Sequence, residues 1–89
     1  MEDLKTYRDK IDAIDAQLVA LFEERMDIVL KIADYKKANN LPILNEGREK
    51  EVIAKNISRL NNKDFADSLE KFFVYMMGLS KEEQKKRNL

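Results

Sequence analysis

An apolar residue recurs at every third or fourth position from Leu4 to Tyr35, the spacing that one face of an α-helix presents. The positions of this seam are Leu4, Tyr7, Ile11, Ile14, Leu18, Leu21, Arg25, Ile28, Ile32 and Tyr35. Nine of the ten are apolar, and a seam sustained this far predicts one long helix. Arg25 is the exception. A charge buried in an apolar seam needs a counter-charge or a ligand, because burying it alone is strongly unfavourable.

The expected helix is too long for its own chain. Asp3 is a suitable N-cap, and the Asn39-Asn40 pair with Pro42 is the first stop signal. About 36 helical residues span about 54 Å, whereas a compact chain of this size has a radius of gyration of about 12 Å. Further apolar residues flank the seam, namely Val19, Phe22, Met26, Val29 and Ala33. The helix therefore predicts a partner chain that covers its overhanging apolar face.

Two shorter helices are expected after it. Asn45 is a good N-cap for a helix over 46–60, and Asp64 is a plausible cap for a helix over 65–86. Gly78, in the middle of the last helix, predicts a close backbone contact. Strand signals are absent, so we expect an all-α protein with a single domain over 1–89.

Composition excludes several classes of function. The 89 residues contain 17 basic and 17 acidic side chains, so no basic field is available to bind nucleic acid. Cysteine and histidine are absent, which argues against a disulfide scaffold, a thiolate nucleophile and the commonest zinc sites. No cofactor or metal is expected. The charged amino terminus is not a signal peptide, and no apolar run approaches the ~18 residues of a membrane span. We expect a cytoplasmic protein that does not enter membranes.

Polar residues interrupt the faces that the pattern turns inward. They are Arg8, Arg25, Lys36, Arg48, Glu49, Ser80 and Gln84. Lys36 follows Arg25 by 11 positions, which is close to three turns and about 16 Å, so both point the same way. Arg8 precedes Arg25 by 17 positions, or about 25 Å, and can join the same site only from an antiparallel partner.

Such a set predicts a cationic pocket for a small dianion that also carries hydroxyl or ether groups. Each residue alone also fits a structural explanation. Arg25 fits an interhelical ion pair, Arg8 a solvated charge, and Lys36 a favourable cation near a helix end. Only their joint placement indicates a site.

The ordered set resembles the all-helical class of chorismate mutases. The matching residues are Arg8, Ile11, Ile14, Asp15, Leu18, Leu21, Arg25, Met26, Lys36, the stretch 41–43, Arg48, Glu49, Ser80 and Gln84. The resemblance implies three helices per chain, an intertwined antiparallel homodimer and two equivalent sites. It also implies the Claisen rearrangement of chorismate to prephenate in aromatic amino acid biosynthesis.

The resemblance further implies which residues would hold the carboxylates of the substrate. Arg25 and Arg48 would grip them from one chain, and Arg8 would reach in from the other chain. Ser80 would line the end of the site that holds the ring carboxylate. Arg25 therefore counts both as a binding residue and as a catalytic one.

The remaining roles implied by the resemblance concern the ether and hydroxyl oxygens. Lys36 would bridge a carboxylate and the ether oxygen, and Gln84 would donate a second hydrogen bond to that oxygen. Glu49 would accept the ring hydroxyl, assisted by the backbone around Asn45. The family usually has aspartate at the position of Asn45, and asparagine caps a helix as well as aspartate does.

Two alternatives are open. An isochorismate pyruvate lyase of the same fold would share Arg8, Arg25 and Lys36, but Glu49 favours the mutase. A non-catalytic helical dimer or regulatory domain would explain the seam, but it leaves Arg25 and the polar Ser80–Gln84 face unexplained.

Overall fold

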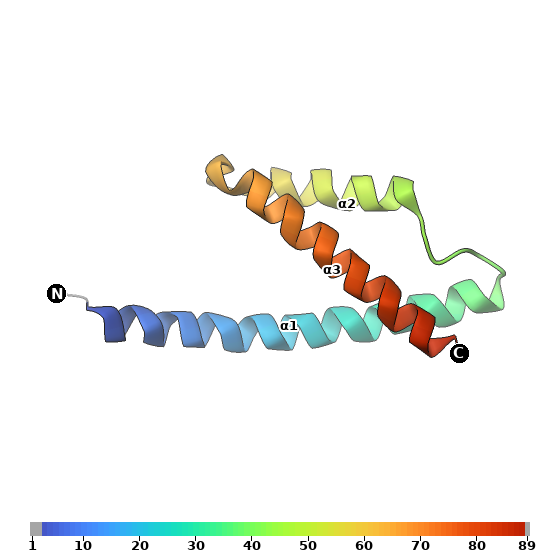
Figure 1. Ribbon diagram of the computed structural model, residues 1–89, viewed down its shortest axis with the longest axis horizontal. Helices are drawn as coiled ribbons and strands as arrows, with labels where there is room; N and C mark the ends of the chain where they lie inside the picture. The colour runs from blue at the N-terminus through green and yellow to red at the C-terminus, as the bar shows by residue number, and fades with distance from the viewer. Residues whose placement is uncertain (1–2, 89) are drawn as a thin grey trace.

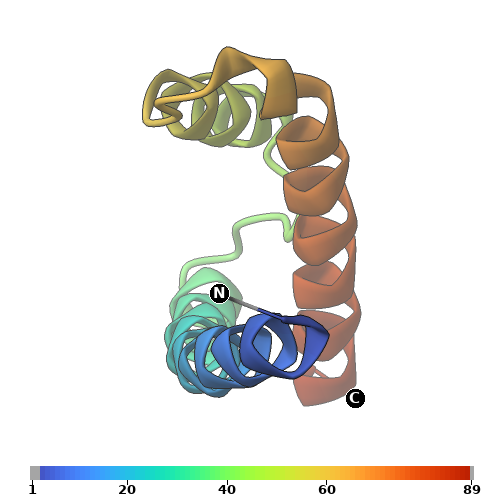
Figure 2. The same ribbon diagram turned by 90° about the vertical axis from the view of Figure 1, so that its left-hand side faces the viewer.

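The computed structural model describes residues 3–88, which form three α-helices and one short 3₁₀ helix (Figure 1). Their bounds are α1 Leu4–Ala38, α2 Glu46–Ser58, η1 Lys63–Phe65 and α3 Ala66–Arg87. The described residues contain no strand, so the all-α prediction is confirmed. Helix α3 packs against both α1 and α2. Viewed along α1, the three helices leave one side of the molecule open (Figure 2).

The ends of α1 lie where the sequence predicts them. Asp3 caps its start, because the carboxylate accepts a hydrogen bond from the Thr6 amide at 2.9 Å. At the other end Asn40 adopts the left-handed conformation, with φ 56°. The Leu41 amide then donates to the Lys36 carbonyl at 2.8 Å, which closes a Schellman motif. The helix stops here because this motif satisfies carbonyls that would otherwise lack partners.

Asn45 begins α2 as expected. Its side-chain oxygen accepts a hydrogen bond from the Arg48 amide at 3.0 Å, which satisfies one of the free amides of the first turn. The helix ends at Ser58, two residues before the predicted limit. This cap places Arg48 and Glu49 in the first turn, next to the connection from α1.

The predicted cap at Asp64 is wrong. Asn62 accepts a hydrogen bond from the Asp64 amide at 3.0 Å and so starts the 3₁₀ helix Lys63–Phe65. Helix α3 begins only at Ala66, and its N-cap Phe65 makes no side-chain hydrogen bond. Asn62 takes the capping role because its short side chain reaches the amide two residues ahead of it.

The core of the single chain is small, and the long seam lies outside it. Its buried apolar residues are Val29, Ala33, Val52, Met76 and Met77. The nine apolar seam residues of α1 are between 43% and 64% exposed. The chain measures 58 × 25 × 15 Å with a radius of gyration of 16.3 Å, well above the roughly 12 Å of a compact chain. The predicted overhang of α1 is therefore confirmed.

The predicted close contact at Gly78 is wrong for this chain. Apart from its chain neighbours and the backbone of its own helix, a Cβ atom built at Gly78 would meet no atom of the described residues within 4 Å. The glycine faces open space, so the fold of one chain does not require it.

Candidate active site

A cleft of 420 Å³ lies between the three helices, and it is called here the polar cleft. Its lining includes seven of the eight residues expected to form the site, namely Arg25, Lys36, Asn45, Arg48, Glu49, Ser80 and Gln84. The lining also contains Lys81 and the apolar residues Ile28, Val29, Ile32, Ile43, Val52 and Met77. Residues far apart in the sequence thus meet around one cavity.

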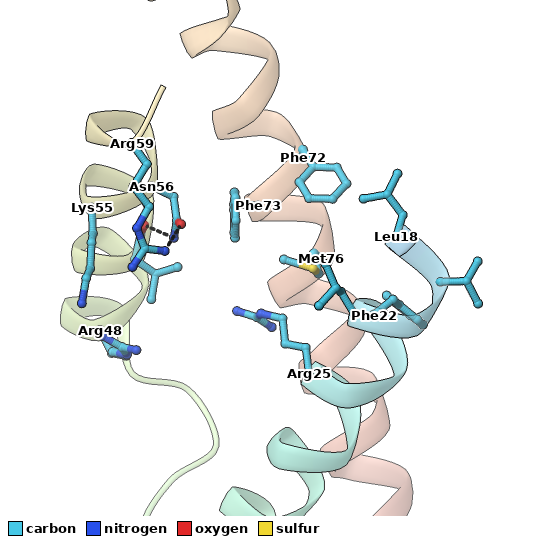
Figure 3. A pocket seen from close by; sticks show the side chains of 13 residues that line it. Leu18, Phe22, Arg25, Arg48, Lys55, Asn56, Arg59, Phe72, Phe73 and Met76 are labelled. Atoms are coloured by element: carbon cyan, nitrogen blue, oxygen red, sulfur yellow. Dashed lines mark hydrogen bonds between the residues drawn. The ribbon is translucent and has the colours of Figure 1, made fainter. Parts of the chain in front are cut away.

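Arg25 enters the cleft from α1. Its Nη1 donates to the Ser80 hydroxyl at 3.3 Å, and that hydroxyl donates to the Met76 carbonyl at 2.9 Å. Figure 3 shows Arg25 and Arg48 reaching from opposite walls into shared space. Burial, and secondarily repulsion by Arg48, lower the pKa of Arg25 below its usual value. Arg25 forms no ion pair with a carboxylate of residues 3–88, which argues against the interhelical ion pair.

Lys36 lies at the end of α1 nearest the connection to α2. The half-buried ammonium donates to the Ile43 carbonyl at 2.7 Å. Ile43 belongs to the connection itself, so the loop holds the lysine over the cleft. An ammonium has three donors, and the contact with Ile43 uses one of them.

Gln84 is buried on α3, with an exposed fraction of 6%. Its Oε1 atom has no hydrogen-bond partner among the described residues. Buried polar atoms are nearly always paired, so an unpaired one lining a cavity is notable. A ligand in the cleft could supply the missing partner. The amide can also turn by about 180° to present its NH₂ group, since its two ends have nearly the same shape.

Glu49 makes the ion pair that connects α2 to α3 across the cleft. Its two oxygens lie 2.8 and 3.3 Å from Nζ of Lys81. Lys81 was not among the site residues expected from the sequence. The signal that could have found it is helical spacing, because Lys81 follows the buried Met77 by one turn and therefore faces the same way.

Arg48, Asn45 and Arg8 are exposed. Nη1 of Arg48 is paired with Glu51 at 2.9 Å on the surface of α2, while the side chain of Asn45 is engaged in capping. Arg8 lies in the N-terminal part of α1 and does not line the cleft. A role for Arg8 from a second chain stays a prediction.

A larger cavity of 610 Å³, called here the apolar cleft, adjoins the polar cleft (Figure 3). The two share Arg25, Arg48 and Val52 in their linings. The apolar residues around it are Leu18, Val19, Leu21, Phe22, Val52, Phe72, Phe73 and Met76. The polar residues Lys55, Asn56 and Arg59 of the same lining come from α2 and the residue after it. Several of the apolar residues are exposed, so this cavity is an open, mainly apolar surface beside the cationic site.

Metal ligands do not gather anywhere in residues 3–88. No group of three or more acidic, histidine or cysteine side chains there could hold a metal ion. None of the helices in this part of the chain is long and apolar enough to cross a membrane.

Comparison with known families agrees with this geometry. Residues 7–85 match the family described as chorismate mutase type II. The chain belongs to this family. The resemblance inferred from the sequence is therefore confirmed, and the match covers all seven expected residues that line the polar cleft.

Curated proteins similar to this type II chain are much longer than it is. The bifunctional chorismate mutase/prephenate dehydratase of Aquifex aeolicus (strain VF5) is 43% identical over 61 residues, covering 68% of this chain and 17% of that protein. The protein of the same name from Buchnera aphidicola subsp. Schizaphis graminum (strain Sg) is 40% identical over 62 residues, covering 67% and 16%. The T-protein of Haemophilus influenzae (strain ATCC 51907 / DSM 11121 / KW20 / Rd) is 39% identical over 49 residues, covering 55% and 13%. The chain spans less than a fifth of the length of each of these relatives.

Proposed function

We propose that this chain is a chorismate mutase, which converts chorismate to prephenate by a Claisen rearrangement. The observation that carries the proposal is the meeting of Arg25, Lys36 and Gln84 in one cleft. Neither cation is paired with a carboxylate of residues 3–88, and the amide oxygen of Gln84 lacks a partner. Such a cleft is complementary to a small dianion with an oxygen between its two halves.

The guanidinium groups would bind the two carboxylates of chorismate. Within residues 3–88, Arg25 has no anionic partner to give up. Arg48 is paired only with the exposed Glu51, and exposed ion pairs contribute only about 0–1 kcal/mol. Exchanging Glu51 for a substrate carboxylate inside the cleft therefore costs little. Two forked guanidinium groups from different helices would fix the orientation of the substrate.

The rearrangement needs restraint and charge stabilisation rather than a nucleophile. Chorismate must be held in a compact conformation, which is a problem of orientation. As the C–O bond lengthens, negative charge grows on the ether oxygen. Lys36 keeps two donors free beside its bond to Ile43, and Gln84 has an amide group to turn toward the same oxygen. Donors fixed there stabilise the transition state more than the ground state.

Glu49 would accept a hydrogen bond from the ring hydroxyl, assisted by the backbone around Asn45. Both residues lie at the start of α2 and line the polar cleft. Ser80 would line the end of the cleft that holds the ring carboxylate, where its hydroxyl already contacts Arg25. A carboxylate acceptor in this place favours the mutase over the isochorismate pyruvate lyase, whose substrate carries its hydroxyl elsewhere on the ring.

The working unit would be an intertwined antiparallel homodimer. The seam of α1 is exposed, and the apolar cleft next to the site is open. The N-terminal half of α1 from a second copy would cover both surfaces. It would also bring the second copy's Arg8 to the polar cleft, which Arg8 does not line within its own chain.

Incubating the purified chain with chorismate tests the proposal. The ultraviolet absorbance follows the loss of chorismate, and chromatography identifies the product. Prephenate is the expected product. Turnover of isochorismate alone would replace the mutase by the lyase. Failure with both substrates would refute the catalytic role and leave a helical dimerisation or regulatory domain.

A further inference from the structure

Lys81 lies in the polar cleft but has no place in the mechanism described so far. Its ammonium lies within hydrogen-bond distance of both oxygens of Glu49, at 2.8 and 3.3 Å. The side chains of Lys81 and Glu49 are only 32% and 25% exposed. By contrast, both side chains of the pair Lys5–Asp9 are more than half exposed. The Lys81–Glu49 pair is thus partly enclosed and joins two different helices.

We propose that Lys81 is a positioning residue that holds the Glu49 carboxylate in place to accept the hydroxyl group of the substrate. The inference rests on the proposed mutase function. Glu49 directly follows Arg48 on α2, and Arg25 and Lys36 line the same cleft. Without Lys81, these cations would compete for the carboxylate. A carboxylate paired with one of them would be turned away from the hydroxyl group, and that cation would be unavailable to the substrate.

The charges in the cleft support this role. Its lining contains four cations, Arg25, Lys36, Arg48 and Lys81, against the single carboxylate of Glu49. Pairing Lys81 with Glu49 leaves three cations to face a dianion. The cleft thereby gains a hydroxyl acceptor while its attraction for the carboxylates is retained. An uncompensated Glu49 would repel those carboxylates at short range, where screening by water is weak.

Two other roles for Lys81 predict different behaviour. If Lys81 bound a substrate carboxylate directly, its contribution would be independent of Glu49. If Lys81 only stabilised the packing of α2 against α3, its loss would lower the melting temperature and would affect activity through unfolding. Acting through Glu49 instead makes the two residues energetically coupled, and a double-mutant cycle measures such coupling.

The experiment uses Lys81→Met and Lys81→Arg, each in the otherwise unchanged chain and combined with Glu49→Gln. The matched control is Lys71→Met, because Lys71 is an exposed lysine of the same helix that lines neither cleft. The measurements are kcat and KM for chorismate, and the melting temperature of each variant. The melting temperature identifies any variant that fails to fold.

Lys81→Met is expected to lower kcat/KM about tenfold, but less than about twofold once Glu49→Gln is present. Lys81→Arg should recover most of the loss, and Lys71→Met should change nothing. Equal losses in both backgrounds would overturn the positioning role, as would a loss that follows the melting temperature. If the unmodified chain leaves chorismate unchanged, the proposed function fails and this inference with it. If the unmodified chain converts chorismate but the losses from the Lys81 and Glu49 substitutions are additive, only the positioning role of Lys81 is refuted.

Discussion

Arg25 and Ser80 lie 55 positions apart in the sequence, yet Nη1 of Arg25 is 3.3 Å from the Ser80 hydroxyl. This contact connects the middle of α1 to α3 at the cleft. It is a hydrogen bond to a neutral group, so the positive charge of Arg25 is oriented but not neutralised. A cation held in this way is available to an anion that enters the cleft.

Replacing Lys36 by alanine should reduce kcat by about 10²–10³, the usual cost of losing one donor to a developing oxyanion. Steady-state kinetics with chorismate measure the loss. Lys37→Ala is the matched control, because Lys37 is the exposed neighbour and lines neither cleft. Near-normal turnover by Lys36→Ala would remove Lys36 from the proposed role.

Gln84→Glu should convert a pH-independent donor into a pH-dependent one. An amide donates at any pH, whereas a carboxyl group donates only when protonated. We expect the unmodified chain to retain activity through neutral pH and the variant to be active mainly in acid. The comparison is a pH profile of kcat for the two proteins. Profiles of the same shape would show that Gln84 does not contact the ether oxygen.

Arg25→Leu should separate activity from stability. Burial and Arg48 already lower the pKa of Arg25, so its charged form is disfavoured in the fold. Removing this charge should leave stability unchanged or raise it by up to ~1 kcal/mol, a small value because the group is partly solvated. Activity should fall by at least about 10². Kinetics and urea unfolding measure the two effects, and near-normal turnover by Arg25→Leu would remove Arg25 from the proposed site.

Mixing two inactive variants tests the proposed contribution of Arg8 from the second copy. In a heterodimer of Arg8→Ala with Arg25→Leu, one site keeps both arginines if Arg8 acts across the interface. Random exchange should then restore about one quarter of normal activity, since half of the dimers would have one intact site. If Arg8 acted within its own chain, no site would contain both arginines and the mixture would stay inactive.

Acid should weaken the ion pair that connects α1 to the C-terminal end of α3. Arg87 donates to both oxygens of Asp34, at 3.2 and 3.0 Å, and this hydrogen bonding lowers the pKa of Asp34 below 3.8. A carboxylate whose pKa is lowered by folding stabilises the fold at pH values above its pKa in the unfolded chain. It loses that contribution as the pH falls through its pKa in the folded chain. Arg87→Ala should therefore show a smaller drop in melting temperature from about pH 5 downward than the unmodified chain. Lys86→Ala, which removes a pair within α3, is the control. Identical pH dependence in Arg87→Ala and the unmodified chain would show that the pair contributes nothing.

Local signals predicted the helix limits well where one side chain decides them. Asp3 and Asn45 cap the first two helices because each reaches an amide three residues ahead. The start of α3 was misplaced because Asn62 and Asp64 are both good caps, and which of them takes an amide depends on the turn that brings α3 onto α2. Chemistry of this kind is visible in the sequence, but the choice between two equal candidates is not.

The site was predicted as a set of residue types and not as a set of contacts. Ser80 and Gln84 were expected to continue the buried face of α3, and both are buried. Lys81 was missed because a lysine beside a buried stripe is most simply a solvated charge. Its pairing with Glu49 depends on the angle at which α2 and α3 cross, and local sequence patterns do not predict that angle. The same limit applies to Gly78, whose open surroundings follow from packing alone.

The uncovered face of α1 has a thermodynamic consequence. A chain whose longest helix displays its apolar residues to water gains much of its stability only on association. If the proposed dimer forms, folding and assembly become one equilibrium, and the melting temperature rises with protein concentration. Dilution alone would then weaken the fold, so the amount of this protein in a cell would determine both how many active sites exist and how long each one lasts.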